Sequence, residues 1–302
     1  MKQYRSGGFG SCGVGLGNFD GIHYGHGALL DTLKQACAAA GLESVVYTFE
    51  NHPNFVLFQD RVTPIIMTCE QKIRILEEKG IDAVYFERFD EAYARMTPEA
   101  FADEILRKKL NARLAVVGYD YTFGAGGKGT AEDLKRLGAA FGLQVLVVPP
   151  VRVGDTVVSS TLLRKMIREG KMREFSAFTG RMYSIPGKVV VGRKVGRSLG
   201  FPTANIIPRE GFAMPKFGVY ATETLISGKM YRSVTNVGDN PTFYRNAGVT
   251  IETYIIDYNN KLYGEHIEVF FAEKIRDEMR FDSPEALSLQ LKRDVLRRRE
   301  MK

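Results

Sequence analysis

Short apolar runs alternate with amphipathic stretches through the first half of the chain. The runs are residues 12–17, 44–49, 83–86, 114–118 and 144–148. Each has the length of a buried strand, and the segments between them have helical periodicity. Strands that alternate with helices predict an open, mostly parallel sheet with helices on both faces. Ligands of such sheets bind at the carboxyl ends of the strands, so we expect a site that collects residues 17–26, 49–53 and 118–124.

Capping signals mark the helix boundaries in this half. Residues 25–40 repeat apolar side chains on one helical face and end at Gly41, a typical C-cap. Thr68 and Thr130 are each followed three residues later by a side chain that can complete a capping box. Thr97 precedes a proline, which predicts a further helix start.

The pattern changes near residue 180. Short β-rich runs follow, separated by Gly, Pro and Asn, at residues 188–191, 218–225, 231–237, 249–257 and 266–271. This pattern predicts an antiparallel barrel or sandwich. Leu287, Leu291 and Val295 then recur at every fourth position, which predicts a helix over residues 284–299 that packs on the β domain. We therefore expect two domains, residues 1–182 and 183–302.

Composition narrows the class of protein. The 302 residues are 44% hydrophobic and 25% charged, which suffices for two cores and excludes intrinsic disorder, collagen and coiled coil. No apolar run reaches the ~18 residues of a membrane span, and the first residues lack a secretory-signal layout, so we expect a cytoplasmic protein. Three cysteines without a CxxC pair argue against a disulfide scaffold or a cysteine-rich zinc site.

The positive charge is concentrated near the C-terminus. Residues 1–180 hold 22 basic and 21 acidic side chains, whereas residues 181–302 hold 20 and 14. Residues 292–302 alone hold six basic and two acidic side chains. Such a run can bind nucleic acid, but a solvated helix end whose cations offset the helix dipole is the simpler interpretation. Because no aromatic residues interleave the run, we expect no nucleic-acid partner.

The segment GNFDGIHYGH follows the first predicted strand and leads directly into the first helix. His23 and His26 are three residues apart and share one face at the helix start, where free N–H groups and the dipole favour anions. The glycines of the segment allow close approach of a ligand. This pattern predicts a phosphate cradle. Two histidines that bind nothing are one alternative, and zinc is another, although the spacing supplies no further ligands for zinc.

A second phosphate-binding pattern lies at residues 159–164, SSTLLR. Three hydroxyls lie at a predicted helix start, and Arg164 follows one turn later. This arrangement suits a pyrophosphate, although an ordinary N-cap has the same sequence pattern. Residues 124–129 spell GxGxxG but follow the strand end by several residues, so we expect a flexible loop and no dinucleotide site. Residues 192–198 fall one residue short of a Walker motif.

The second half offers a different constellation. A glycine-rich basic loop precedes Thr203 and Asn205, which lie two residues apart in an extended segment and so point to the same side. Their neutral oxygens suit a Mg²⁺ ion that also binds nucleotide phosphates. Glu252 lies on the polar face of a predicted strand, where a carboxylate can accept the proton of a hydroxyl substrate. A β-turn and a surface glutamate remain the alternatives.

In combination, these motifs resemble the bifunctional bacterial riboflavin kinase/FMN adenylyltransferase (FAD synthetase) family over essentially the whole chain. The spelling HxGH is itself typical of nucleotidyltransferases. The matching motifs are GNFDGIHYGH (17–26), TFENHP (48–53), GYDYTFG (118–124), SSTLLR (159–164), GRMYSIPGKVVVG (180–192), GRSLGFPTAN (196–205), NVGDNPTF (236–243) and KIRDEMRFDS (274–283).

The resemblance implies an α/β Rossmann-like nucleotidyltransferase domain, followed by an antiparallel six-stranded β-barrel kinase domain with a C-terminal helix. The barrel would phosphorylate riboflavin to FMN, and the first domain would transfer AMP from ATP to FMN, giving FAD and pyrophosphate. Mg²⁺ is the implied cofactor, ATP the co-substrate, and riboflavin, FMN and FAD the substrates and products. We expect these small molecules as partners of a monomer or weak homo-oligomer, with no nucleic acid and no membrane.

The resemblance also implies roles for individual residues. In the adenylyltransferase, the implied catalytic residues are His23 and His26, and the implied ATP-binding residues are Gly17, Asn18, Phe19, Ser160, Thr161 and Arg164. His52 and Asp120 would lie in loops that contact flavin and nucleotide. In the kinase, Glu252 would be catalytic, and ATP would contact Gly192, Gly196, Arg197, Thr203 and Asn205, of which the last two would bind Mg²⁺. Arg276, Glu278 and Phe281 would bind the flavin.

Three positions depart from the family pattern. Asn51 replaces the usual proline of EPHP, Leu162 replaces an arginine, and Asp239 and Asn240 stand where an arginine commonly precedes the proline. None of these positions carries an assigned chemical role. The nearest rival hypothesis is a chain with one active module, its adenylyltransferase impaired by Leu162. A second rival is a flavin-dependent regulator that binds nucleic acid through the C-terminal helix.

Overall fold

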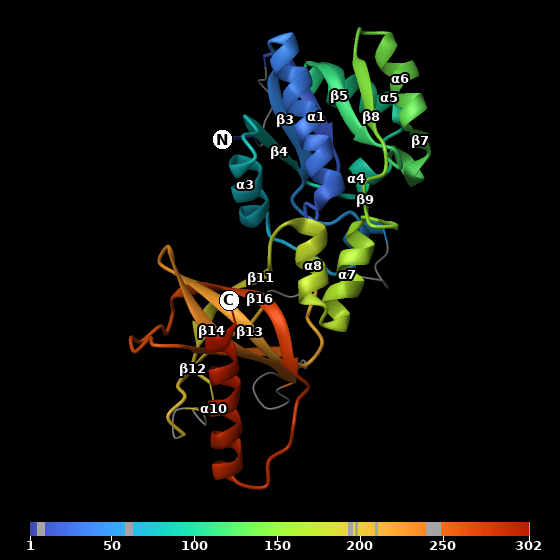
Figure 1. The fold of residues 1–302 in the computed structure, drawn as a ribbon. Helices are drawn as coiled ribbons and strands as arrows, with labels where there is room; N and C mark the ends of the chain where they lie inside the picture. Colours follow the sequence, from blue (N-terminus) through green and yellow to red (C-terminus); the bar gives the residue numbers. More distant parts are fainter. Residues whose placement is uncertain are drawn as a thin grey trace. The chain divides into compact units, whose positions relative to one another are not determined.

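The computed structural model describes residues 1–4, 10–57, 63–192, 196, 199–208, 211–239 and 249–301 (Figure 1). The chain forms two units, Met1–Ser160 and Thr161–Lys302. The second unit therefore includes nearly all of α7 (Ser160–Glu169) and all of α8 (Met172–Thr179), which precede the barrel in the chain. Phe175 of α8 packs edge-on against Tyr183 at a centroid distance of 5.4 Å, and this contact joins the helix to the first barrel strand.

A six-stranded sheet forms the centre of the first unit, and all of its strand pairs are parallel. In spatial order the strands are β1 (Lys2–Tyr4), β4 (Ala83–Glu87), β3 (Glu43–Phe49), β2 (Cys12–Leu16), β5 (Ala112–Gly118) and β8 (Gln144–Val148). The prediction of an open parallel sheet and of its five apolar strands is confirmed. β1 was not predicted, because a three-residue edge strand carries no apolar run.

Helices cover both faces of this sheet, as predicted (Figure 1). One face packs against α1 (Tyr24–Ala40) and α3 (Cys69–Glu78), and the other packs against the π-helix η1 (Phe101–Lys109) and α6 (Ala131–Ala139). The shorter helices are α2 (Asn54–Leu57), α4 (Glu91–Ala94) and α5 (Pro98–Ala100). Both capping boxes, at Thr68 and Thr130, and the Thr97 cap are present.

Two glycines of β2 bring α1 close to the sheet. A Cβ atom at Gly13 would overlap Cys37 Sγ, and one at Gly15 would lie 3.1 Å from a methyl group of Leu33. The helix begins eight residues after β2 and ends at Gly41, whose φ of 65° is left-handed. The start of α1 is therefore fixed at the carboxyl end of β2, where the predicted phosphate cradle lies.

The GxGxxG segment is an ordered hairpin. β6 (Thr122–Phe123) pairs with β7 (Gly129–Thr130), and the turn η2 (Ala125–Gly127) connects them. Gly124 lies so close to Pro98 that a Cβ would approach the proline ring to 2.8 Å. The expectation of a flexible loop is therefore not met, because contacts with α5 hold the turn. A second small hairpin pairs β9 (Arg152–Val153) with β10 (Thr156–Val157).

The second unit contains a closed antiparallel barrel of six strands, which confirms the barrel alternative over the sandwich. Around the barrel the strands are β11 (Tyr183–Val190), β12 (Thr203–Ile206), β15 (Val249–Ile255), β14 (Lys229–Asp239), β13 (Gly218–Ile226) and β16 (His266–Arg276). β12 was not predicted as a strand because its four residues, Thr-Ala-Asn-Ile, carry little apolar signal.

A ladder of hydroxyl groups fills part of the barrel interior. Thr222 bonds to Ser233 and Thr235 at 2.8 and 2.7 Å, Thr224 bonds to Ser233 at 2.8 Å, and Thr235 bonds to Thr253 at 2.9 Å. All five side chains are fully buried. Because a hydroxyl can donate or accept, each of the five has at least one hydrogen-bond partner within the ladder.

The predicted C-terminal helix is α10 (Pro284–Glu300), which packs on the outside of the barrel. Val295 contacts the apolar cluster of Val219, Ala221, Val234 and Ile275. The helix residues with the least exposure are polar: Asp294 and Arg298, each at 2%. Within the described ranges, no helix is long and apolar enough to cross a membrane.

Candidate active sites

The first site begins with a strained loop between β2 and α1. Phe19, Gly21 and Ile22 have φ values of 46°, 88° and 28°, so two residues with side chains adopt a left-handed backbone. The buried carboxylate of Asp20 accepts hydrogen bonds from the backbone N–H groups of Ile66 at 3.0 Å and Met67 at 3.2 Å. These bonds hold the loop in its unusual conformation.

His23 is the N-cap of α1 and is only 7% exposed. Its Nδ1 accepts a hydrogen bond from the His26 backbone N–H at 3.2 Å, so a neutral His23 ring carries its proton on Nε2. The two imidazole rings stack at a centroid distance of 3.9 Å with an interplanar angle of 12°. Gly25 makes room for this arrangement, because a Cβ there would lie 3.0 Å from His23 Nδ1. The pair sits at a helix N-terminus, where anions are favoured.

Two donors converge on the carbonyl of Asn18 in the same loop. Lys72 Nζ donates to it at 2.8 Å and Thr48 Oγ1 donates at 3.0 Å. Lys72 lies on α3 and is largely buried. Its ammonium group therefore adds a cation to the loop that the motif did not reveal, since the residue is distant in sequence and has no motif of its own.

The carboxyl ends of β3 and β5 carry the other predicted loops of this site. The His52 Nδ1 accepts a hydrogen bond from the Asn54 N–H at 3.2 Å, and Asp120 is exposed just after β5. Asn51 bonds in both directions with the backbone of Phe89: its Nδ2 donates to the carbonyl at 2.7 Å and its Oδ1 accepts from the N–H at 3.0 Å. Asn51, which stands where the family pattern has proline, therefore connects the end of β3 to the end of β4.

The SSTLLR segment begins α7. Ser160, the last residue of the first unit, donates from Oγ to the carbonyl of Asp20 at 2.6 Å. Thr161 is exposed, and Leu162 and Arg164 are half-buried. This bond connects Ser160 to the His23 loop, although Ser160 and Asp20 are 140 residues apart in the sequence.

The second site is a row of three polar residues on adjacent barrel strands. Asn205 of β12 and Asn236 of β14 are both the register partners of Glu252 on β15. Side chains directly opposite one another on antiparallel strands have Cβ atoms about 5 Å apart on the same face. Glu252 therefore lies between two amide side chains, on the face opposite to the hydroxyl ladder of Thr253.

Two neighbouring loops border this row. The Asn205 Nδ2 lies 3.5 Å from Thr203 Oγ1, so the two predicted metal ligands do face the same side. A Cβ at Gly192 would overlap the Asn205 amide, and one at Gly196 would overlap the carbonyl of Phe201. These glycines are required by close packing. Arg197 and Asn240 lie outside the described residues.

The predicted flavin segment follows β16. Glu278 reaches β14, since a Cβ at Gly238 would overlap its Oε1 and would lie 3.3 Å from Asn236 Nδ2. The ring of Phe281 lies 5.8 Å from the Arg276 guanidinium carbon. The structure therefore brings Glu278 next to the Asn236 end of the polar row, whereas the Arg276 guanidinium bonds to Asp294 of α10 at 2.8 Å.

Asn236 and Lys72 were not among the residues predicted for the sites, and Asp20 was predicted only as part of the segment 17–26, without a role of its own. Asn236 carried a detectable signal, because it opens the NVGDNPTF motif and alternates with buried Thr235 and Val237. Lys72 carried none, since it lies in an ordinary amphipathic helix.

Comparisons with known proteins match each half of the chain to a separate family model. The FAD synthetase family model matches residues 9–162, and the riboflavin kinase family model matches residues 179–302. Proteins named bifunctional riboflavin kinase/FMN adenylyltransferase are similar along nearly the whole chain. That of Listeria monocytogenes is 35% identical over 93% of this chain and 89% of its own, and that of Escherichia coli K12 is 36% identical over 96% and 92%.

A solved structure, described as a macrolide-efflux protein from Streptococcus pneumoniae, has the same fold. It is 34% identical, covers 99% of both chains and superposes with a TM-score of 0.90. Two family models in tandem and relatives that match both domains leave one assignment: the chain belongs to the bifunctional riboflavin kinase/FMN adenylyltransferase family.

Proposed function

We propose that the chain makes FAD from riboflavin in two steps, one at each site. The barrel transfers a phosphoryl group from ATP to riboflavin, and the first domain then transfers AMP from a second ATP to FMN. The observation that carries the proposal is that each family model covers a separate polar site, the histidine pair in one case and the Asn205–Glu252–Asn236 row in the other. We assign residues 1–182 to the adenylyltransferase and residues 183–302 to the kinase.

In the adenylyltransferase, an oxygen of the FMN phosphate attacks the α-phosphorus of ATP, and the bond to pyrophosphate breaks. Negative charge grows on the phosphate oxygens as this happens. His23 donates from Nε2, His26 stacks on it, and the N–H groups at the start of α1 add further donors. Lys72 supplies positive charge behind the loop. We assign phosphate contacts to residues 17–19 and to Ser160, Thr161 and Arg164, and flavin or nucleotide contacts to His52 and Asp120.

In the kinase, Glu252 accepts the proton of the riboflavin 5′-hydroxyl as that oxygen attacks the γ-phosphorus, and ADP leaves. Asn205 and Asn236 flank Glu252 and fix its direction. Residues Gly192, Gly196 and Arg197 contact the ATP phosphates in this proposal, and Arg276, Glu278 and Phe281 contact the flavin.

The donor set at Thr203 and Asn205 fits Mg²⁺. A hydroxyl and an amide lie on one face with 3.5 Å between Asn205 Nδ2 and Thr203 Oγ1, and rotation of the amide presents its oxygen. Two neutral oxygens suit an ion that takes its remaining ligands from water and phosphate. Thr203 and Asn205 would hold the ion, which when bound would supply positive charge for the transferred phosphoryl group.

The regulator hypothesis loses its main support in the last turn of α10. Arg298 donates to the Thr222 carbonyl at 3.0 Å and to Glu223 at 3.2 Å. Arg299 bonds to Asp257 at 2.6 Å, and Arg297 donates to the Ile275 carbonyl at 3.1 Å. These three arginines bind the helix to the barrel, so half of the six basic residues in the run have a structural role.

One experiment tests both steps. Purified protein is incubated with riboflavin, ATP and Mg²⁺, and the flavins are separated by chromatography, in parallel with Glu252→Ala and with a His23→Ala/His26→Ala double variant. We expect FAD from the wild type, unreacted riboflavin from the first variant and accumulated FMN from the second. FMN without FAD from the wild type would instead support a single active module, and absence of any phosphorylated flavin would refute the proposal.

A further inference from the structure

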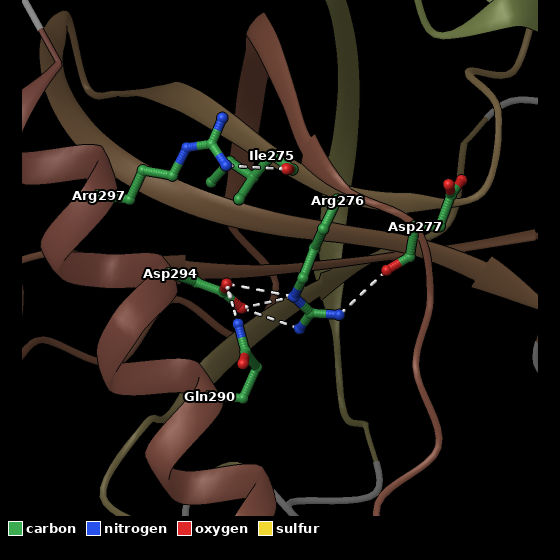
Figure 2. A network of polar contacts seen from close by, with 6 residues as sticks. All are labelled: Ile275, Arg276, Asp277, Gln290, Asp294 and Arg297. Carbon is green, nitrogen blue, oxygen red and sulfur yellow. Dashed lines mark hydrogen bonds and ion pairs between the residues drawn. The ribbon is translucent and has the colours of Figure 1, made fainter.

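A buried ion pair connects α10 to the end of β16 (Figure 2). Arg276 is the last residue of β16, and its Nε and Nη2 donate to the carboxylate of Asp294 at 3.1 and 2.8 Å. Gln290, one turn earlier on α10, donates to the same carboxylate at 2.9 Å. The side chain of Asp294 is 2% exposed and that of Arg276 is 15% exposed. The pair is therefore bidentate, shielded from water and supported by a third side chain.

The pair closes a loop that includes the flavin segment. The chain leaves β16 at Arg276, passes through residues 277–283 and returns at Asp294 of α10. Residues 277–280 are exposed and belong to no helix or strand, so a few side-chain contacts determine where they lie, among them the ion pairs of Asp277 with Lys216 and Lys274. At the start of the segment, the Arg276 Nη1 donates to the Asp277 carbonyl at 3.1 Å, which extends the same network (Figure 2). The Arg276 guanidinium also lies over the Phe281 ring.

The segment held in this way borders the catalytic row of the proposed kinase. Glu278 Oε1 occupies the space next to Gly238, beside the Asn236 amide. Asn236 is the register partner of Glu252. The pair thus holds the start of the segment, and Glu278, two residues after Arg276 in the chain, lies near Asn236, the register partner of the catalytic carboxylate.

A buried ion pair is a poor source of stability, because desolvation of two charges offsets their attraction. Its geometry, however, is stringent: the planar guanidinium accepts only a narrow range of carboxylate positions. Arg298 and Val295 already hold α10 on the barrel, so the Arg276–Asp294 pair is not needed to attach the helix. Its distinctive effect is to fix the direction of one guanidinium and of the segment that begins there.

We propose that Asp294 is a positioning residue of the riboflavin kinase. By holding Arg276, it keeps residues 277–281 ordered over Gly238 before riboflavin arrives, so the substrate does not have to order them itself. Binding that must order a mobile segment is weakened by the cost of ordering. Loss of the pair therefore raises KM for riboflavin more than it lowers kcat. This inference depends on the proposed kinase function, and the experiment below includes a readout that does not.

The test uses the full chain with Asp294→Asn, which keeps the shape but removes the charge, and with Gln290→Leu, which removes only the supporting bond. Glu300→Gln, an exposed charge change on the same helix, is the matched control. Steady-state kinetics are measured separately for FMN formation and for FAD formation from added FMN. We expect Asp294→Asn to raise KM for riboflavin about tenfold, with kcat changed less than about threefold and FAD formation unchanged. Gln290→Leu should raise KM for riboflavin by about two- to threefold, and Glu300→Gln should leave this KM unchanged.

Trypsin provides the second readout, because Arg280 lies in the exposed segment. Cleavage after Arg280 should be faster in Asp294→Asn than in the wild type, and riboflavin should slow it. If Asp294→Asn raises KM for ATP as much as KM for riboflavin and lowers the rate of FAD formation to the same extent, the variant is generally destabilised and the proposal is overturned. An unchanged KM for riboflavin in a folded Asp294→Asn protein would also overturn it. If Asp294→Asn does not fold, the KM for riboflavin of Gln290→Leu tests the proposal in its place. A wild type without kinase activity whose Arg280 cleavage still depends on Asp294 would refute the proposed function but leave the segment assignment standing.

Discussion

The two sites of this chain are assembled in different ways. The site in the first unit is a loop of consecutive residues, with Phe19, Ile22 and His23 held in unusual backbone or capping conformations by the buried Asp20. The barrel site consists of single residues from separate strands, Asn205, Asn236 and Glu252, brought together by register alone. A site of the first kind can be recognised from one sequence motif, because its residues are consecutive. A site of the second kind forms only when the strands pair.

This difference has a physical consequence. The loop depends on a few bonds that maintain a strained backbone, so a single remote substitution can displace the whole cradle. The barrel row lies on strands with neighbours on both sides, so a substitution there changes one side chain and leaves the others in position. The variants below test that contrast, from the largest expected effect to the smallest.

The largest effect is expected from Asp20→Ala. The change removes the acceptor of the Ile66 and Met67 N–H groups and releases the loop, so FAD formation from FMN should fall about 100-fold or more. Asp20→Asn keeps one acceptor oxygen, so its rate of FAD formation should fall less. Riboflavin kinase activity, measured in the same preparation, should be unchanged in both variants. Asp31→Ala, an exposed carboxylate on α1, is the control. Equal rates of FAD formation in Asp20→Ala and wild type would refute the role of the loop.

Asn236→Ala should act on the other site alone. Loss of the amide beside Glu252 should lower kcat of FMN formation about tenfold, and Asn236→Asp should lower it further because a second carboxylate repels Glu252. FAD formation from FMN should remain at the wild-type rate. Asn260→Ala, an exposed position of the same unit, serves as the matched variant. Wild-type kinase kinetics in Asn236→Ala would remove Asn236 from the site.

Thr235→Val tests whether the hydroxyl ladder stabilises the barrel. The substitution conserves shape but leaves Thr222 and Thr253 each without one hydrogen-bond partner, which should cost about 1–3 kcal/mol of unfolding free energy. Thr224→Val breaks a single bond and should cost less. Urea denaturation gives both values, with the exposed Thr156→Val as reference. A Thr235→Val protein as stable as the wild type would show that water or repacking replaces the ladder.

The smallest expected effect concerns thiol reactivity. Burial raises the pKa of Cys12 to about 12 and that of Cys37 to about 11, whereas Cys69 is only half-buried. A thiol reacts as its thiolate, so at pH 8 about one Cys12 in 10⁴ is ionised. Alkylation of the native protein followed by mass spectrometry should label Cys69 first, and labelling of the other two should rise with pH or on unfolding. Faster labelling of Cys12 than Cys69 would contradict the burial of the first.

The amino-acid sequence by itself determined the larger divisions. Apolar runs predicted five of the strands in the parallel sheet, and capping residues such as Thr68 and Gly41 fixed helix ends, because both signals act over a few neighbouring residues. The HxGH segment was recognisable for the same reason: strand, glycines, histidines and helix start are contiguous.

Tertiary structure decided what local signals do not contain. Short strands such as β1 and β12 form because longer neighbours offer free edges. The barrel interior holds hydroxyl groups where a periodic pattern predicts apolar side chains, since cross-strand pairing satisfies them. Asn236 becomes a neighbour of Glu252, and Asp294 a partner of Arg276, only when the barrel closes and α10 packs on it. Contacts between residues distant in the chain depend on register and closure, which no single segment of sequence specifies.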